Sequence, residues 1–164
     1  MKLATRPRSS DLPARVKADR VIAKLREAEK ALQFATTVHQ AKLVSDVAAA
    51  QELFAHRQRL GDEITSYAHE IKIYALAKLG ELLRDMPKAT GTRGQLKGDV
   101  VSGTRLAPPT KSVADTYADL GLSKKTAAIA QQLAALPTVI RDAIAKQETT
   151  LAQAKRAEMA ERVA

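Results

Sequence analysis

The sequence predicts an all-α protein in which an N-terminal helical arm, of two or three helices, is joined by a basic linker to a second helical domain. Three observations support this prediction. Residues 13–86 are rich in strong helix formers and contain no proline after Pro13. Residues 87–111 gather glycine, proline and basic residues. Residues 112–164 return to helix formers, with one glycine, Gly121, as a turn signal.

Charge and composition narrow the class of partner. The 164-residue chain has 27 Lys and Arg against 18 Asp and Glu, and its pI of about 9.9 indicates a polyanionic partner. Nucleic acid is favoured over an anionic membrane, because membrane binding needs a hydrophobic span or a strongly apolar helix face beside the basic one, and no apolar run approaches the roughly 18 residues of a spanning helix. The absence of cysteine excludes disulfides and thiolate metal sites and is compatible with the cytoplasm. Residues 1–12 lack an apolar segment, so we expect a disordered basic tail rather than a secretory signal.

Apolar residues in the arm recur at the spacing of helix faces. The clearest stripe begins after Asp62, and two others precede Gly61 and the pair Thr36 and Thr37, where we expect helix breaks. The stripes are Ile64, Ala68, Ile71, Ala75, Leu79, Leu82 and Met86; Leu43, Val47, Ala50 and Phe54; and Ile22, Leu25, Ala28 and Leu32. Each stripe requires a partner helix, so residues 13–86 are expected to self-associate as a homodimer or higher homo-oligomer.

The linker, residues 87–111, carries four glycines, three prolines and five basic residues against one acid. A connection of this length without secondary structure of its own is unusual inside a compact domain. It therefore either tethers two units or contacts DNA as an arm that becomes ordered on binding. Its candidate DNA-binding residues are Arg93, Arg105 and Lys111.

Residues 112–164 are predicted to form four short helices. Ser112 can cap the first, which ends before a left-handed turn at Gly121. Ser123 can cap the second. The remaining boundaries are Leu120 at the end of the first helix, Leu136 at the end of the second, Pro137 and Ile144 for the third, and Thr149 or Thr150 for the start of the fourth.

The first two of these helices have the layout of a helix-turn-helix domain, whose second helix enters the major groove of DNA. Ile129, Leu133 and Leu136 give that helix a buried face, and its lysines point away from this face. Lysine binds phosphate or guanine and glutamine pairs with adenine, so the exposed residues have the chemistry of groove readout. The candidate DNA-binding residues are Ser123, Lys124, Lys125, Thr126, Ala128 and Gln132, with Gly121 as the turn.

The stretch GLSKKTAAIAQQLAALPTVIRDAIAKQETTLAQAKR resembles the helix-turn-helix domain of the ParB and KorB partition proteins. The shared features are a GxS turn, a recognition helix, a leucine-proline step, a short helix and an Ala-x-Ala segment. They fall here on Gly121, Ser123, Leu136, Pro137, Val139, Ile144, Leu151 and Ala154. The arm ending in KLGELLRDMPK is also similar to small DNA-binding proteins of phages and mobile elements. The resemblance implies sequence-specific binding of double-stranded DNA by a transcriptional regulator or partition-like factor, in the bacterial nucleoid or a phage-infected cell.

Two positions depart from the family pattern. Tyr117 stands where the family usually has alanine, and Ala127 stands where it usually has a larger apolar residue, so the helix crossing need not follow the family. The arm has neither a strand-rich pattern nor a Gly-rich phosphate loop. The resemblance therefore does not extend to the nucleotide-binding domain of the partition proteins or to CTP hydrolysis.

No catalytic, metal or cofactor motif accompanies these features, and we expect no enzymatic activity. His69 and Glu70 begin an HExxH-like stretch, but Ile73 replaces the second histidine. Glu63, Glu70 and Glu81 lie among basic residues on helix faces, where we expect i,i+4 ion pairs. The competing interpretation is a helical protein-protein adaptor whose nucleic-acid binding is nonspecific or incidental.

Overall fold

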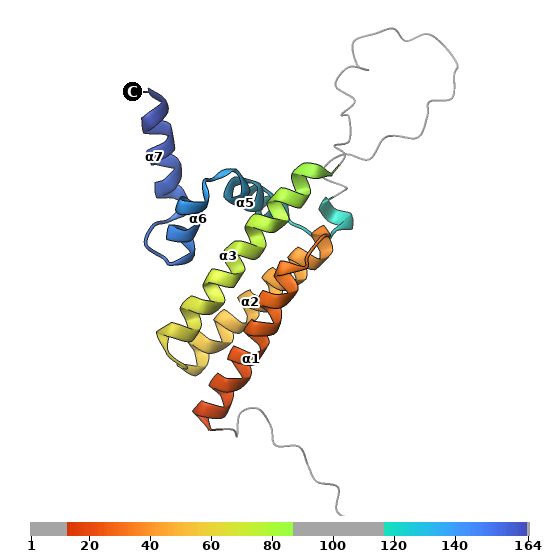
Figure 1. The fold of residues 1–164 in the computed structure, drawn as a ribbon, viewed down its shortest axis with the longest axis vertical. Coiled ribbons are helices and arrows are strands. Elements are labelled where there is room, and N and C mark those ends of the chain that lie inside the picture. Colours follow the sequence, from red (N-terminus) through yellow and green to blue (C-terminus); the bar gives the residue numbers. More distant parts are fainter. Residues whose placement is uncertain (1–12, 87–116, 164) are drawn as a thin grey trace, which may run out of the picture.

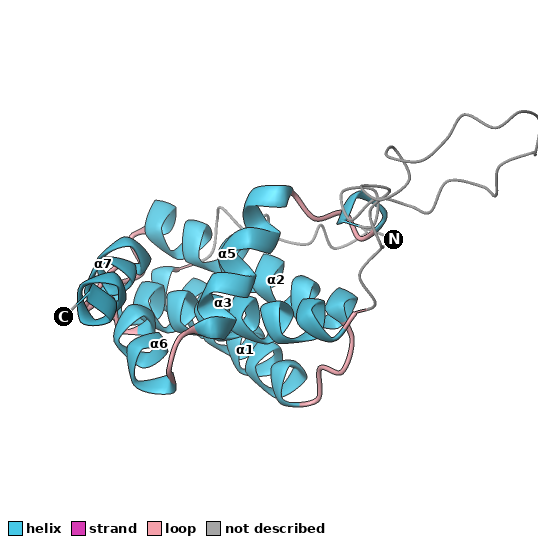
Figure 2. Ribbon diagram, turned by 90° about the horizontal axis from the view of Figure 1, so that it is seen from above, coloured by secondary structure: helices cyan, strands magenta, loops and turns pink. Residues whose placement is uncertain are grey.

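The computed structural model describes residues 13–86 and 117–163, and each element labelled in it is a helix (Figures 1 and 2). The predicted all-α class is therefore confirmed. The helices are α1 (Ala14–Gln33), α2 (Val38–Gln58), α3 (Asp62–Asp85), α5 (Lys124–Ala135), α6 (Thr138–Ala145) and α7 (Leu151–Val163). The predicted basic tail and the linker, residues 1–12 and 87–111, lie outside the described residues.

Helices α1, α2 and α3 run alternately up and down as a three-helix bundle (Figure 1). Thr37 begins α2: its hydroxyl accepts a hydrogen bond from the Gln40 N–H at 3.2 Å, and the Gln40 side chain accepts one from the Thr37 N–H. Arg59 ends α2 in a left-handed conformation with φ of 50°, and Gly61, with φ of 109°, precedes α3. Both predicted breaks are confirmed.

Helix α3 lies at the centre of the molecule because it is buried on two faces. One face, which holds Ala68, Ile71 and Ala75, packs against α1 and α2. The other, which holds Ile73 and Ala77, packs against α5, α6 and α7. In Figure 1, α3 accordingly lies between the α1–α2 pair and the C-terminal helices. The arm and the C-terminal helices thus share their cores through α3.

The predicted apolar stripes differ in their burial. In α1 and α3, the predicted residues Leu25, Ala28, Ala68, Ile71, Ala75 and Leu79 are buried. The stripe predicted for α2 is wrong as a core face: Leu43 is 58% exposed and Ala50 is exposed, while Val47 and Phe54 reach the core only in part. The face that α2 buries is rich in alanine instead, namely Val38, Ala41, Val44, Ser45, Ala48 and Ala55. Small side chains let helix axes approach closely, so this face packs better than the bulkier one.

Helix α5 crosses α3 at very short range. A Cβ atom on Gly80 would lie 2.0 Å from the carbonyl oxygen of Ala130 and 2.8 Å from the backbone nitrogen of Gln131. Ala127 and Ala130 are both buried in α5. Residue 80 must therefore be glycine for the two backbones to approach this closely.

Polar contacts also join α3 to α6. The Tyr74 hydroxyl donates a hydrogen bond to Asp142 at 2.7 Å, and Arg141 donates one to Glu81 at 3.1 Å. Burial, followed by the hydrogen bond to the Asp142 carboxylate, raises the pKa of Tyr74 to about 12. The expected i,i+4 pairing of Glu81 is wrong, because its ion-pair partners are Arg141 and Lys78, three residues before it.

Candidate nucleic-acid interface

A tight turn connects the helical residues 117–119 to α5. Gly121 has φ of 63°, its N–H donates to the Ala118 carbonyl at 2.9 Å, and the Leu122 N–H donates to the Tyr117 carbonyl at 2.8 Å. This pair of bonds around a left-handed glycine is the Schellman motif, which ends helices. Leu122 is 6% exposed and anchors the turn among buried residues of α2, α3 and α5. The predicted left-handed turn at Gly121 is therefore confirmed.

Ser123 caps α5, as predicted. Its hydroxyl oxygen accepts a hydrogen bond from the Thr126 N–H at 3.0 Å and lies 2.8 Å from the Thr126 hydroxyl oxygen. Two of the predicted DNA-binding residues thus fix the first turn of α5 in the free protein. A hydroxyl that is part of a cap keeps hydrogen-bonding capacity for a phosphate, so the two roles are compatible.

The side of α5 that faces away from α3 carries the other predicted residues. Lys124, Lys125 and Ala128 are exposed, and Gln132 is half-buried. At 100° of rotation per residue these four positions share one side of the helix, opposite the side centred on Ala130. The remaining predicted contacts, in the linker, lie outside the described residues. They are Arg93, Arg105 and Lys111.

Lys124 and Lys125 occupy the end of α5 where helices favour acidic side chains. The unpaired N–H groups give a helix N-terminus a partial positive charge, so a cation there destabilises the helix by about 0.3–1 kcal/mol. Helix α5 has no acidic residue to offset this repulsion. The first turn of α5 is therefore a concentration of positive charge that an anion would stabilise.

Both departures from the family pattern lie in one hydrophobic cluster. Tyr117 is half-buried and Ala127 is 1% exposed, and both belong to the cluster around Leu122. The Tyr117 hydroxyl also accepts a hydrogen bond from the Gln131 side chain at 3.0 Å. The large Tyr117 before the turn is thus combined with the small Ala127 of α5 in this cluster.

One cation beside the turn belongs to no sequence motif. A Cβ atom on Gly121 would lie 3.9 Å from the Lys42 Cε atom, so this lysine of α2 borders the turn. Its ammonium group pairs with Asp46 at 2.7 Å. No sequence signal marks Lys42, because it reaches the turn only through the packing of α2 against Leu122.

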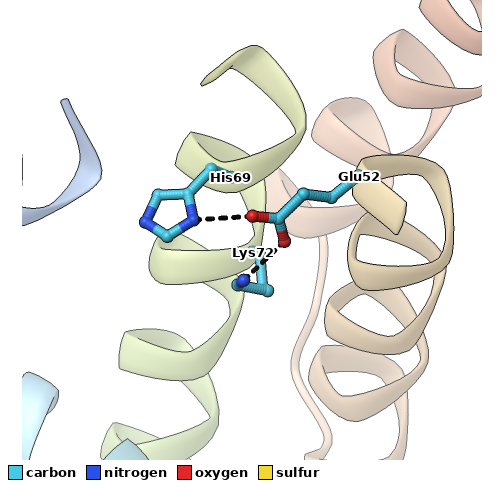
Figure 3. A network of polar contacts seen from close by, with 3 residues as sticks. All are labelled: Glu52, His69 and Lys72. Carbon is cyan, nitrogen blue, oxygen red and sulfur yellow. Dashed lines mark hydrogen bonds and ion pairs between the residues drawn. The ribbon is translucent and has the colours of Figure 1, made fainter. Parts of the chain in front are cut away.

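A separate polar cluster joins α2 to α3 (Figure 3). Glu52 accepts hydrogen bonds from His69 Nδ1 at 2.9 Å and from Lys72 Nζ at 2.5 Å. Burial raises the pKa of Glu52, but the hydrogen bonds from Lys72 and His69 outweigh it, so the pKa lies below its usual value. His69 is thus engaged with a carboxylate. Within the described residues, no group of three or more His, Cys, Asp or Glu side chains is placed to hold a metal ion.

A groove of about 630 Å³ runs along α1 and α2. Its lining includes Ala50 and Phe54 from the stripe predicted for α2, and Arg20, Lys24 and Glu27 from α1. The groove therefore combines apolar surface with mainly basic side chains.

Comparison with known proteins gives no relative. No protein-family model matches the chain, and no curated protein or solved structure is significantly similar to it. None of the helices within residues 13–86 and 117–163 combines the length and hydrophobicity needed to cross a bilayer. The function must therefore be argued from the surfaces themselves.

Proposed function

We propose that the chain binds double-stranded DNA at specific sites through the exposed side of α5. It acts as a small transcriptional regulator or partition-like factor of a phage or mobile element, in the cytoplasm and without catalysis. The observation that carries the proposal is the pair of exposed lysines, Lys124 and Lys125, at the N-terminus of α5. The net charge of +9 and the resemblance to partition proteins favour duplex DNA as the anion.

The support of α5 suits such a role. Leu122 anchors the turn before it, and Ala127 and Ala130 fix the helix against α3. Side chains on a helix held in this way reach their targets at defined positions, which specific recognition requires. Gln132 follows Lys124 by about two turns, where it can contact a flanking base or phosphate.

Selection of bound duplexes from a random pool tests the proposal. We expect an enriched sequence, and we expect Lys124→Ala or Lys125→Ala to cost about 1–3 kcal/mol on that sequence if the lysine contacts a base. A lysine that contacts phosphate would instead weaken all sequences alike and flatten the salt dependence. Arg57→Ala is the control, because Arg57 lies about 28 Å along α2 from Val38, which packs with Ala127. Lysine variants that bind like the parent would contradict the recognition role of α5.

We further propose that two copies associate through the outer stripe of α2. The residues Leu43, Val47, Ala50 and Phe54 have spacings of four, three and four, which are the same in either direction. In an antiparallel pair, Leu43 can therefore face Phe54 of a second copy, and Val47 can face Ala50. A twofold interface requires this kind of self-complementary surface. The α5 helices of two copies related by twofold symmetry would fit a palindromic DNA site.

Sedimentation of the full chain tests this association. Leu43→Glu should convert the homodimer to monomer, because it buries a charge in the proposed contact. Leu53→Glu is a matched control: Leu53 is 51% exposed on the same helix but lies off the stripe. A parent chain that is monomeric at high concentration would contradict self-association through α2.

The alternative function, a protein-protein adaptor, is favoured by the groove along α1 and α2. Its basic residues, Arg20 and Lys24, and its apolar residues suit an acidic amphipathic segment of another protein. Duplex binding that weakens as salt rises is expected of the DNA-binding function and not of an adaptor. A monomer whose duplex binding is weak and independent of sequence would favour the adaptor.

A further inference from the structure

Lys42 and Asp46 form an ion pair at the edge of the proposed DNA-binding surface. Lys42 Cε lies 3.9 Å from the position of a Cβ atom on Gly121, two residues before the cap Ser123. Val38 and Ala41 of α2 pack in the same cluster as Leu122 of the turn. The stem of Lys42 therefore lies beside the turn, and its ammonium group reaches Asp46.

The ion pair between Lys42 and Asp46 is weak enough for Lys42 to exchange Asp46 for another anion. Lys42 Nζ lies 2.7 Å from Asp46 Oδ2, and the side chains of Lys42 and Asp46 are 26% and 60% exposed. Because Asp46 is open to solvent, a pair of this kind contributes at most about 1 kcal/mol. A lysine four residues before an acid is also the less favourable order on a helix. Helix α2 therefore loses little stability if the ammonium group moves to another anion.

We propose that Lys42 is a phosphate-binding residue of the DNA site and that Asp46 competes with the phosphate for it. The inference rests on the proposed function of α5. Duplex DNA seated on the first turn of α5 carries a phosphate past the Gly121 turn, where Lys42 can donate to it. Asp46 keeps Lys42 neutralised in the free protein and repels the incoming phosphate, so it weakens binding to every sequence equally.

Two substitutions with opposite effects test this inference by titration of duplex DNA at several salt concentrations. Lys42→Ala should weaken binding about two- to fivefold on all sequences and reduce the slope of log K against log salt by about 0.9. Asp46→Asn should tighten binding by a similar factor on all sequences. Arg57→Ala removes one positive charge from the same helix about 22 Å away and should bind like the parent. Circular dichroism checks that each variant is folded.

The outcomes separate this inference from the proposed function. If Lys124→Ala loses affinity while Lys42→Ala and Asp46→Asn keep the affinity and salt slope of the parent, the role of Lys42 is overturned and that of α5 stands. Weaker binding by Asp46→Asn would overturn the competition, because Asp46 would then position Lys42. A parent chain without salt-dependent binding would overturn the proposed function and the Lys42 contact together.

Discussion

Gly80 determines how closely α5, the proposed DNA-recognition helix, can approach α3. A methyl group at this position would lie 2.0 Å from the Ala130 carbonyl oxygen, which belongs to backbone and cannot rotate away. Gly80→Ala should therefore lower the free energy of unfolding by at least about 2 kcal/mol, despite a gain of roughly 1 kcal/mol in helix propensity. Denaturant unfolding measures the change. Ser66→Ala, on the exposed side of α3, is the control, and a Gly80→Ala variant as stable as the parent would contradict the crossing.

Lys124 should contribute to binding at the expense of stability. Lys124→Glu places an acid at the N-terminus of α5, so we expect the free energy of unfolding to rise by about 0.3–1 kcal/mol while duplex binding is lost. Lys146→Glu is a control of opposite sign, because Lys146 lies at the C-terminal end of α6, where an acid destabilises. Thermal unfolding and a DNA titration measure the two properties. A loss of stability in Lys124→Glu would contradict the dipole argument.

The stability that the polar cluster between α2 and α3 contributes should depend on pH. Glu52 has a lowered pKa in the folded protein, so its ionised form adds stability above its ordinary pKa of 4.5, and this stability is lost as the pH falls toward the folded pKa. We expect Glu52→Gln to cost about 1–2 kcal/mol at neutral pH, from its bonds to His69 and Lys72. The difference from the parent should shrink below pH 4.5. Denaturant unfolding of the parent and Glu52→Gln across this pH range measures the difference. Glu148→Gln is the control, because Glu148 is exposed. A difference between parent and Glu52→Gln that does not change with pH would contradict the prediction.

The limits of the helices could be predicted because they depend on neighbouring residues. Thr37, Gly61 and Ser123 act through their own side chains or backbone within one turn, so the sequence near each position is sufficient. The exposed lysines of α5 could be placed in the same way, from helical periodicity and the buried positions of that helix. This covers the all-α class and the part of the candidate site that lies within α5.

The faces that helices present to one another could not be predicted in this way. The large residues of α2 indicated its buried side, but its alanines pack closer, and Leu43 remains exposed. The second buried face of α3 was missed because Ile73 and Ala77 are few and flank residues already assigned to a stripe. Lys42 enters the candidate site only through this packing. Such choices depend on surfaces that are distant in sequence.

For the whole molecule, the shared cores predict a single cooperative unit. Leu133 of α5 is 1% exposed and packs in one cluster with Ile73 and Ala77 of α3. Leu133→Ala should cost about 2–5 kcal/mol and lower the stability of the bundle together with that of the C-terminal helices. A single thermal transition, seen equally by circular dichroism and by hydrogen exchange in α1, would support this. Two transitions, with α1–α3 unfolding as in the parent, would show that the arm folds independently.

The face of α3 that holds Ile73, Ala77 and Gly80 makes the contact between residues 13–86 and 117–163 equivalent to a protein-protein interface within one chain. The intervening residues then set the effective concentration at which the two parts meet. A chain cut between them would be held only by the intrinsic affinity of the two pieces, through surfaces that include the Gly80 crossing. We expect such pieces to reconstitute the fold when mixed. The effect of a substitution at the interface could then be measured as a change in the dissociation constant of the two pieces.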